Sequence, residues 1–543
     1  MEKLKNLLKK VLTREVIMYI IFGVLTTLVN LIVSFVLEGP FKLDGAWASA
    51  IGIVASILFA YFTNRKMVFN TTAKGFKENL NEFIKFILGR AVTMVIEQGG
   101  VVIFYSIMGL AFMPVKLSLT IIVVILNFFF SKFFAFKKEE SLSPEDKKIK
   151  NIKILLGLLA FIIPLVIFLA IIYVVVYLNG PGTVLNNDMG NQYASFFEFF
   201  KRTLEQGNLS SLYHTLEKND GSFIGLFGYY LASPINILFV IFNNLDVIDV
   251  IPIVIAIKIG IAGLTAYIFL QHKAISEKKV NNYFWALMLS ICYALCAYNI
   301  VYSNNIMWLD SVYLLPLMFL GIDRLIEKNK NILYIITLAL ALIINYYTGF
   351  MMCIASAIYY VWAQLYKMPK INLENIKKIW KNILFYAISS ILACGVACIM
   401  LLPVFLDLKE GKASSFNLSN INLKENCNIF EVYSKLFFGE GNDNVDLTND
   451  GLPRIYTGTI TLFLVLQYFI SKKQKIKDKI LNGVVIIGFF LCFMTQGLNL
   501  IWHGLSIPNW FPYRYSFVFG AFMVLFAYLQ TLSSSEEERR NKK

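Results

Sequence analysis

The residues best suited to chemistry lie in one polar stretch, Asn186–Tyr193, which reads NNDMGNQY. An apolar run long enough to cross a bilayer precedes it, over residues 152–178, and the next such run begins near residue 250. About seventy residues therefore connect two membrane spans, and a connection of that length with its own aromatic residues is usually ordered and functional. Asp188 is its first carboxylate, so we interpret Asp188 as the candidate general base of a reaction centre.

A structural role is the alternative for Asp188. Asp before a helix is a common N-cap, and together with Asn186, Asn187 and Asn191 the carboxylate could instead bind calcium. Asp310 is the main rival of Asp188 for the role of base.

Four further polar and aromatic motifs lie between apolar runs and are predicted to face the same compartment as Asp188. They are YYLASPIN (229–236), NNIMWLD (304–310), NYYTGF (345–350) and NLIWHGLSIPNWFPYRYSF (499–517). Each motif alone is typical of the belt in which Trp and Tyr settle at headgroup depth. Together they predict one polar, aromatic-lined site that suits a sugar. The residues expected to bind substrate there are Gln192, Tyr193, Tyr230, Lys258, Trp308, Asp310, Asn345, Tyr346, His503 and Arg514.

The composition indicates a polytopic membrane protein. Of the 543 residues, 57% are hydrophobic and only 16% are charged, and the mean hydropathy is +0.63, whereas about a quarter of the residues in soluble proteins are charged. The net charge of +15 does not indicate nucleic acid binding, because Lys and Arg gather between apolar runs. By the positive-inside rule, fourteen spans satisfy every basic cluster, both termini are cytoplasmic and the Asp188 loop is external. Residues 16–37 form the first span rather than a cleaved signal peptide.

The first 136 residues contain an internal repeat, which is visible when the sequence is shifted by 67 positions against itself. Glu15 then coincides with Glu82. The segment FAYFTNRKMVF, residues 59–69, likewise coincides with LNFFFSKFFAF, residues 126–136. The repeat predicts a duplicated helical hairpin of four spans, whose copies are related by an axis along the membrane normal.

Four charged residues of these hairpins are candidates for function. Arg65, Arg90 and Lys132 lie at predicted cytoplasmic helix ends, where they could hold a lipid phosphate or act as ordinary positive-inside anchors. Glu97 falls in the middle of a span, where a carboxylate is costly enough to mark a functional site by default. Its structural alternative is a hydrogen bond to the side of the repeat that holds Asn30.

The motif NRxxVF at the end of the second span, together with its echo after the fourth, resembles the GtrA family. Members of that family are regarded as flippases, or helpers of flippases, for polyprenyl-phosphate-linked sugars. The resemblance implies this role for residues 1–140 and leaves a homo-oligomer through this module open. A charged linker over residues 141–151 is expected to precede a second module of ten spans, residues 152–532, and residues 533–543 form a cytoplasmic tail.

The order of motifs in the second module resembles the YfhO family of bacterial membrane proteins. The patterns that carry the resemblance are DxxxQY, YYxxSPxN, WxD, NYYxG and WHGxxxPNWFPYRYSF. That family looks like GT-C glycosyltransferases, which use polyprenyl-phosphate sugars and carry an essential acidic residue in a large first external loop. The resemblance therefore implies an all-α protein of a bacterial plasma membrane and assigns the essential acidic residue to Asp188.

Both resemblances favour transfer of a sugar from a polyprenyl phosphate to an extracytoplasmic acceptor, such as teichoic acid, lipoteichoic acid or a membrane glycolipid. In this interpretation Asp188 takes the proton of the acceptor hydroxyl, the anomeric carbon inverts, and the lipid phosphate leaves toward a cation. Arg514 is the first choice for that cation because a guanidinium matches phosphate geometry, and His503 and Lys258 are weaker candidates. No metal ligands are identified, and a divalent cation is left open as a cofactor.

Two other functions are compatible with the sequence. The chain could be a transporter in which both modules move lipid-linked sugar without transferase activity, or it could be a non-catalytic scaffold of cell-wall assembly. The intramembrane Glu97 favours transport in the first module, whereas the long external loop with Asp188 favours chemistry in the second.

Overall fold

The computed structural model describes scattered residues of 18–36, then 45–69, 76–101, 123–136 with two gaps, 144–178, 184–207 without 186, 212, 223–276 without 243, 282–368, 380–410, 424–439 and 451–541. The regular secondary structure in these residues is helical, apart from one isolated bridge between Glu425 and Thr495. The chain divides into two compact units, Met1–Lys147 and Lys148–Lys543. The prediction of an all-α polytopic membrane protein is confirmed.

The first unit shows the sequence repeat as repeated local structure. Helix α3, Gly45–Thr63, runs into a π-helical turn, η1, at Asn64–Val68, and the matching segment of the second repeat forms η3 at Ser131–Ala135. Each turn closes with a backbone hydrogen bond donated by the next residue, of 2.9 Å from Phe69 and 2.8 Å from Phe136. The rings of these two residues stack, with centroids 5.4 Å apart. The equivalent ends of the two hairpins therefore meet in one aromatic core.

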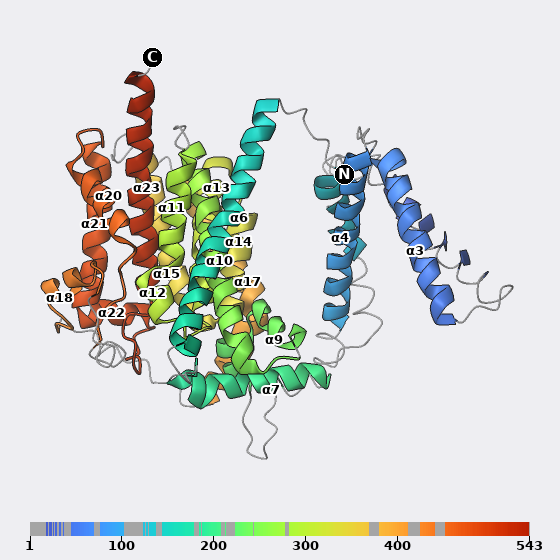
Figure 1. Cartoon of the computed structure of the whole chain (residues 1–543), viewed down its shortest axis with the longest axis horizontal. Coiled ribbons are helices and arrows are strands. Elements are labelled where there is room, and N and C mark those ends of the chain that lie inside the picture. Colours follow the sequence, from blue (N-terminus) through green and yellow to red (C-terminus); the bar gives the residue numbers. More distant parts are fainter. Residues whose placement is uncertain are drawn as a thin grey trace. The chain divides into compact units, whose positions relative to one another are not determined.

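The second unit is a bundle of long helices that carries shorter elements at one end (Figure 1). The long helices are α6 Pro144–Ile172, α10 Val247–Ser276, α11 Tyr283–Ala294, α13 Leu309–Lys328, α14 Ile332–Ile344, α15 Tyr346–Lys367, α17 Trp380–Glu410, α20 Thr459–Ile470, α21 Ile476–Met494 and α23 Ser516–Asn541. Among the described residues, six stretches are long and apolar enough to cross a membrane, or seven if one bent pair counts as a span. They lie in α6, α10, α11 with the following short helix, α15, α17 and α23.

The shorter elements gather at what we call the loop end of the bundle, which lies at the bottom of Figure 1. They are η4 Tyr173–Leu178, η5 Met189–Tyr193, α7 Ala194–Glu205, α8 Ile224–Leu226, η7 Phe227–Leu231, η8 Pro234–Ile237, α9 Leu238–Ile241, α12 Ala297–Val301, α18 Ile429–Ser434 and α22 Gln496–Trp502. Helix α7 lies across this end and buries one face through Phe197, Phe200 and Thr203. The described parts of the connection after α6 thus contain several short helices.

A bent helix pair is the central element of the loop end. Residues Ile224–Leu231 and Pro234–Ile241 are both helical, but their axes differ by 89°. Ser233, between them, has an extended backbone, and Pro234 occupies the first position of the second helix, where its missing N–H is not needed. The bend places Tyr229 and Tyr230 at the end of the first arm.

The helices of the second unit differ strongly in burial. Helix α23 is almost wholly buried and α10 is mostly buried, whereas most of the surface of α6 and α17 is exposed. The exposed side chains of α6 and α17 are largely Ile, Leu, Val and Phe. Such a surface suits contact with lipid, so α10 and α23 form the interior of the bundle and α6 and α17 its margin.

The structure refines two expected boundaries. The predicted linker, 141–151, contains the start of α6, because Pro144 begins that helix. The division between the two units falls inside the same linker. The expected tail, 533–543, is helical as far as Asn541, where α23 ends.

Helices α10 and α13 run parallel and are joined by two buried ion pairs. Lys258 Nζ lies 2.6 Å from Asp310 Oδ2 near the loop end. About four turns further along both helices, Lys273 Nζ lies 3.2 Å from Asp323 Oδ2. No more than 1% of any of these four side chains is exposed. Because a buried charge without a counter-charge is very costly, the two pairs fix the register of α13 against α10.

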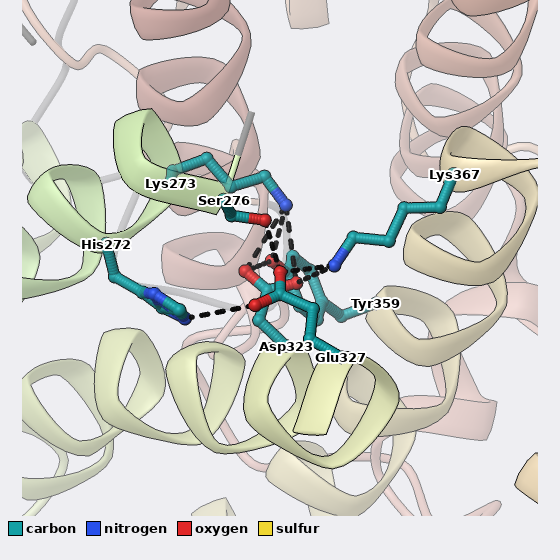
Figure 2. A network of polar contacts seen from close by, with 7 residues as sticks. All are labelled: His272, Lys273, Ser276, Asp323, Glu327, Tyr359 and Lys367. Carbon is teal, nitrogen blue, oxygen red and sulfur yellow. Dashed lines mark hydrogen bonds and ion pairs between the residues drawn. The ribbon is translucent and has the colours of Figure 1, made fainter. Parts of the chain in front are cut away.

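The second pair belongs to a larger network at the end of the bundle opposite the loop end (Figure 2). The Tyr359 hydroxyl donates to Asp323 Oδ2 over 3.0 Å, and Lys367 pairs with Glu327. His272 Nε2 lies 3.7 Å from Glu327 Oε2. The network therefore ties α15 to the α10 and α13 pair.

Asp323→Asn should destabilise the protein strongly, because it leaves the Lys273 ammonium buried without its counter-charge. Loss of one partner of a buried pair costs about 3–5 kcal/mol. The double variant Lys273→Met with Asp323→Leu should recover most of this loss. Thermal unfolding of the purified protein in detergent measures the effect. Glu198→Gln, which breaks the exposed pair of Glu198 with Arg202, should change stability by less than about 1 kcal/mol, and equal effects of the two single variants would contradict the assignment.

Candidate functional site

Asp188 is positioned by a tight backbone turn at the loop end. Asn187 has a left-handed conformation, with φ at 50°, which Asn tolerates better than most residues. The Asn187 carbonyl accepts hydrogen bonds from the backbone N–H groups of Gly190 and Asn191, both at 3.2 Å. Asp188 is half-buried, and its side chain makes no capping bond to the helical turn that follows. The N-cap alternative for Asp188 is therefore wrong.

The Asp188 carboxylate has one close partner among the described residues. The Tyr193 hydroxyl lies 3.3 Å from Asp188 Oδ2 and 3.1 Å from the side-chain oxygen of Asn305. Burial raises the pKa of Tyr193, so its hydroxyl stays protonated and donates to one of these oxygens at a time. The other Asp188 oxygen has no partner among the described residues, as a general base requires. Within the described chain, no group of three or more His, Cys, Asp or Glu residues could hold a metal ion.

Five tyrosines form a continuous tyrosine wall beside Asp188. Ring centroids are 5.2 Å apart between Tyr193 and Tyr230, and 4.6 Å apart between Tyr230 and Tyr229. Tyr229 is 5.9 Å from Tyr346 and 6.0 Å from Tyr347, at the start of α15. The first three tyrosines lie in π-helical turns, η5 and η7, and such turns occur frequently at functional sites. Together these rings line a site with flat faces and hydroxyl groups.

Arg514 contacts the tyrosine wall at Tyr229 and Tyr347, whereas Asp188 contacts it at Tyr193. Its guanidinium carbon is 4.9 Å from the Trp308 ring centroid and 5.1 Å from that of Tyr347, within the range of cation–π attraction. Nη2 donates to the carbonyls of Asn509 and Trp510, over 2.8 and 3.2 Å. Nε is buried and has no acceptor in the described part of the chain. The charge is thus fixed in place beside the tyrosine wall.

The loop that holds Arg514 has an unusual backbone. Trp510 and Phe511 have φ values of 60° and 50°, in the left-handed region that bulky residues rarely adopt. Two carbonyls of this loop, those of Asn509 and Trp510, are the ones that accept from Arg514. The strained turn therefore orients the guanidinium, and such strain is common in ligand-binding segments.

His503 is not the phosphate-binding cation that the sequence allowed. It is buried, and burial together with the charge of Arg514 lowers its pKa to about 3. Its Nε2 lies 2.7 Å from the carbonyl oxygen of Pro512, which only accepts, so Nε2 carries the proton. Nδ1 then accepts from the Tyr347 hydroxyl at 2.6 Å. His503 is neutral and orients Tyr347, whose ring contacts the Arg514 guanidinium.

Lys258 and Asp310 lie below the tyrosine wall and satisfy each other. Lys258 also donates to the Ile306 carbonyl over 3.0 Å. The second oxygen of Asp310 accepts from Ser233, over 2.6 Å, and from Tyr313, over 2.8 Å. Neither charge is free for substrate in this conformation, which corrects the expectation that Lys258 and Asp310 bind substrate. Of the two carboxylates considered as the general base, Asp188 and Asp310, only Asp188 is open.

The remaining predicted residues fall into three groups. Trp308 and Asn345 are buried, and both hold Tyr229 through hydrogen bonds, so their contact with substrate stays a prediction. Tyr230 and Tyr346 are half-buried members of the tyrosine wall. Gln192 is exposed on η5, next to Tyr193.

The candidate residues of the first unit are only partly described. Arg65 pairs with Glu82 over 3.2 Å and also contacts the Asn79 side chain, so it is not a free anchor. Arg90 lies over the Phe86 ring, and Lys132 is 5.6 Å from the centroid of the Phe128 ring. Glu97 belongs to helix α4, Phe76–Val101, but its side chain lies outside the described residues. The role of all four in holding lipid stays a prediction.

Sequence reasoning missed Tyr229, Tyr347 and Asn305. Each stands inside a quoted motif, directly beside or near a residue that was selected. Adjacent residues of a regular helix point in different directions, so the sequence favoured one tyrosine of each YY pair. Tyr229 and Tyr230 lie in a π-helical turn beside the bend, and both belong to the tyrosine wall. The intramembrane Lys273 and Asp323 were the signal for the second ion pair, because charges in apolar runs require partners.

Residues 160–542, more than half of the chain, match the family described as "Bacterial membrane protein YfhO", and residues 18–136 match "GtrA/DPMS, transmembrane domain". The "Cell wall teichoic acid glycosylation protein GtcA" of Listeria monocytogenes is 31% identical over 145 residues, which are 26% of this chain and 100% of that protein. The protein of the same name from Listeria innocua is 34% identical over 123 residues, 23% of this chain and 85% of its own.

"Uncharacterized membrane protein YwcD" of Bacillus subtilis is 31% identical over 121 residues, 22% of this chain and 95% of its own. No solved structure matches the chain significantly. The relatives resemble the first unit, and the YfhO match covers nearly all of the second. The chain therefore belongs to the YfhO family of bacterial membrane proteins and carries an amino-terminal transmembrane domain of the GtrA family.

Proposed function

We propose that the second unit is a glycosyltransferase that moves a sugar from a polyprenyl phosphate to an acceptor outside the cytoplasm. The single observation that carries this proposal is that one tyrosine wall contacts both a carboxylate, Asp188 at Tyr193, and a fixed guanidinium, Arg514 at Tyr347. A base at one side and a cation at the other suit attack by a hydroxyl and departure of a phosphate. The aromatic faces between them suit a sugar ring.

In the proposed reaction, an acceptor hydroxyl loses its proton to Asp188 as its oxygen bonds to the anomeric carbon. The bond from that carbon to the phosphate oxygen breaks at the opposite face, so the configuration inverts. Phosphate needs no proton to leave, but the growing negative charge needs a donor. Arg514 supplies it, because a guanidinium matches phosphate geometry and keeps its charge at any physiological pH.

The acceptor is proposed from the names of the relatives. Two proteins that match the first unit are named for teichoic acid glycosylation in the cell wall. We infer that the GtrA-type unit brings the lipid-linked sugar across the membrane and that the YfhO-type unit attaches it to a teichoic acid or a related envelope polymer. A lipid-linked donor is the natural choice outside the cytoplasm, since nucleotide sugars are made inside.

Asp188→Asn should leave folding and donor binding intact but lower kcat by about 10²-fold or more, the usual effect of losing a positioned general base. Asp188→Glu should recover only part of this, because a carboxylate displaced by about 1 Å transfers protons poorly. Transfer of labelled sugar from a polyprenyl phosphate to envelope polymer measures kcat. Asp246→Asn, which alters an exposed carboxylate ahead of α10, is the matched control. Near-normal transfer by Asp188→Asn would favour the transporter instead.

Arg514→Ala should raise the donor KM and lower kcat, because the departing phosphate loses its charged donor. A loss of about 10²-fold in kcat/KM is expected from the removal of one such group. Arg514→Lys should recover part of the activity, since it keeps the charge but not the planar geometry. Arg202→Ala, on the exposed surface of α7, is the control. Unchanged donor kinetics in Arg514→Ala would remove this residue from the site.

A protein truncated to residues 144–543 should still transfer sugar when donor is supplied in detergent, because every residue proposed to act in transfer belongs to the second unit. In sealed vesicles with donor added to the cytoplasmic side only, the truncated protein should fall behind the full chain. Product formation in the two settings is the measurement. A folded, truncated protein that is inactive in detergent would refute the division of roles.

A further inference from the structure

Tyr229 is fixed both through its backbone and through its ring. Its backbone carbonyl accepts a hydrogen bond of 2.8 Å from the Asn345 side chain. Its ring meets those of Tyr230, Tyr346 and Tyr347. Its own side chain is half-buried rather than enclosed. The Tyr229 hydroxyl is therefore held at a fixed position in a side chain that is not fully buried.

Both neighbours of the Tyr229 hydroxyl are groups that can only donate. Trp308 Nε1 lies 3.1 Å from this oxygen, and Arg514 Nη1 lies 3.4 Å from it. An indole N–H and a guanidinium have no lone pair to offer, whereas a phenol has two acceptor sites and one proton. The two neighbours thus occupy the acceptor sites of Tyr229, and its proton must go to a third group. The described residues offer no acceptor for that proton.

The other tyrosines near Arg514 and Asp188 differ in this respect. Tyr347 gives its proton to His503 Nδ1, over 2.6 Å. Tyr193 gives its proton to Asp188 or Asn305. Of these three tyrosines, only Tyr229 has a hydroxyl whose described neighbours are both donors, so its proton is available to an acceptor on a ligand.

The position of this proton identifies the chemical class of its acceptor. Arg514, with its buried and unpaired Nε, stands directly beside the Tyr229 hydroxyl. Two adjacent donors, one of them charged, suit two oxygens of an anion, and phosphate is the anion whose geometry a guanidinium matches. A neighbouring cation also makes a hydroxyl a stronger donor, since it withdraws electron density from the oxygen.

We propose that Tyr229 is a second phosphate-binding residue, which donates its hydroxyl proton to a phosphate oxygen that Arg514 binds as well. The inference rests on the proposed function for its setting. The phosphate is either that of the lipid donor or a phosphodiester of the polymer acceptor. In the first case the bond strengthens as the sugar leaves, because negative charge grows on that oxygen.

The test is Tyr229→Phe in the full-length protein, which keeps the ring and removes only the hydroxyl. Polyprenyl phosphate without sugar is the first probe, and its affinity should fall at least about 5-fold with loss of one hydrogen bond to a charged group. Transfer kinetics then give the donor and polymer KM values, and kcat with the lipid donor should fall at least about 10-fold. Weaker polyprenyl phosphate binding assigns the donor phosphate, and a raised polymer KM alone assigns the acceptor phosphodiester.

Tyr360→Phe is the matched control. It also removes a tyrosine hydroxyl that accepts a hydrogen bond, here from Gln364 over 3.0 Å, but Tyr360 lies toward the other end of α15. Equal thermal unfolding of the two variants shows that Tyr229→Phe has not merely weakened the fold. If polyprenyl phosphate binding and both KM values match the control, Tyr229 does not bind phosphate. The binding assay needs no transfer, so this result is separate from failure of the glycosyltransferase proposal, which Asp188→Asn reports.

Discussion

The buried pair of Lys258 and Asp310 is the interaction on which the site depends. A charge on either residue alone would be prohibitive in the interior, so the two helices that carry them must stay in register. The same carboxylate accepts from Ser233, the residue at the break of the bent pair. The Asp310 carboxylate thus fixes the positions of α10, α13 and the bend relative to one another. Tyr229 stands four residues before Ser233, and Trp308 stands two before Asp310, so their contact follows from it.

This arrangement separates residues that touch a ligand from residues that hold them. Asp188, Arg514 and the tyrosine faces lie at the surface of the site, whereas Trp308, Asn345 and His503 are buried behind it. The buried layer consists of groups whose hydrogen bonds are directed outward, to a hydroxyl or a carbonyl of the wall. Such a layer limits the rotamers of the tyrosines, and a site that is rigid before binding loses less entropy when a sugar arrives.

Much of the fold could be predicted from the sequence, because lipid imposes helices and charges mark their ends. Asp188 and Arg514 could also be selected as candidates from the sequence, since each stands in a polar motif beside an apolar run. How deeply each charge is buried could not be predicted from the sequence. Lys258 and Arg514 are both cations near aromatic residues, and only the packing of α10 on α13 shows that Asp310 neutralises Lys258. The role of Tyr229 depends on a π-helical turn and an 89° bend, and that of Tyr347 on its contacts with His503 and Arg514, which local patterns do not encode.

The stacking of Phe69 on Phe136 in the first unit has an evolutionary consequence. These residues occupy the same place in the two repeats, and contact between equivalent residues is the mark of a twofold interface between identical subunits. A single hairpin would already possess the surface needed to associate with a copy of itself. Gene duplication then converts that dimer into one chain, after which the halves can diverge, as Arg65 and Lys132 have done at matching positions.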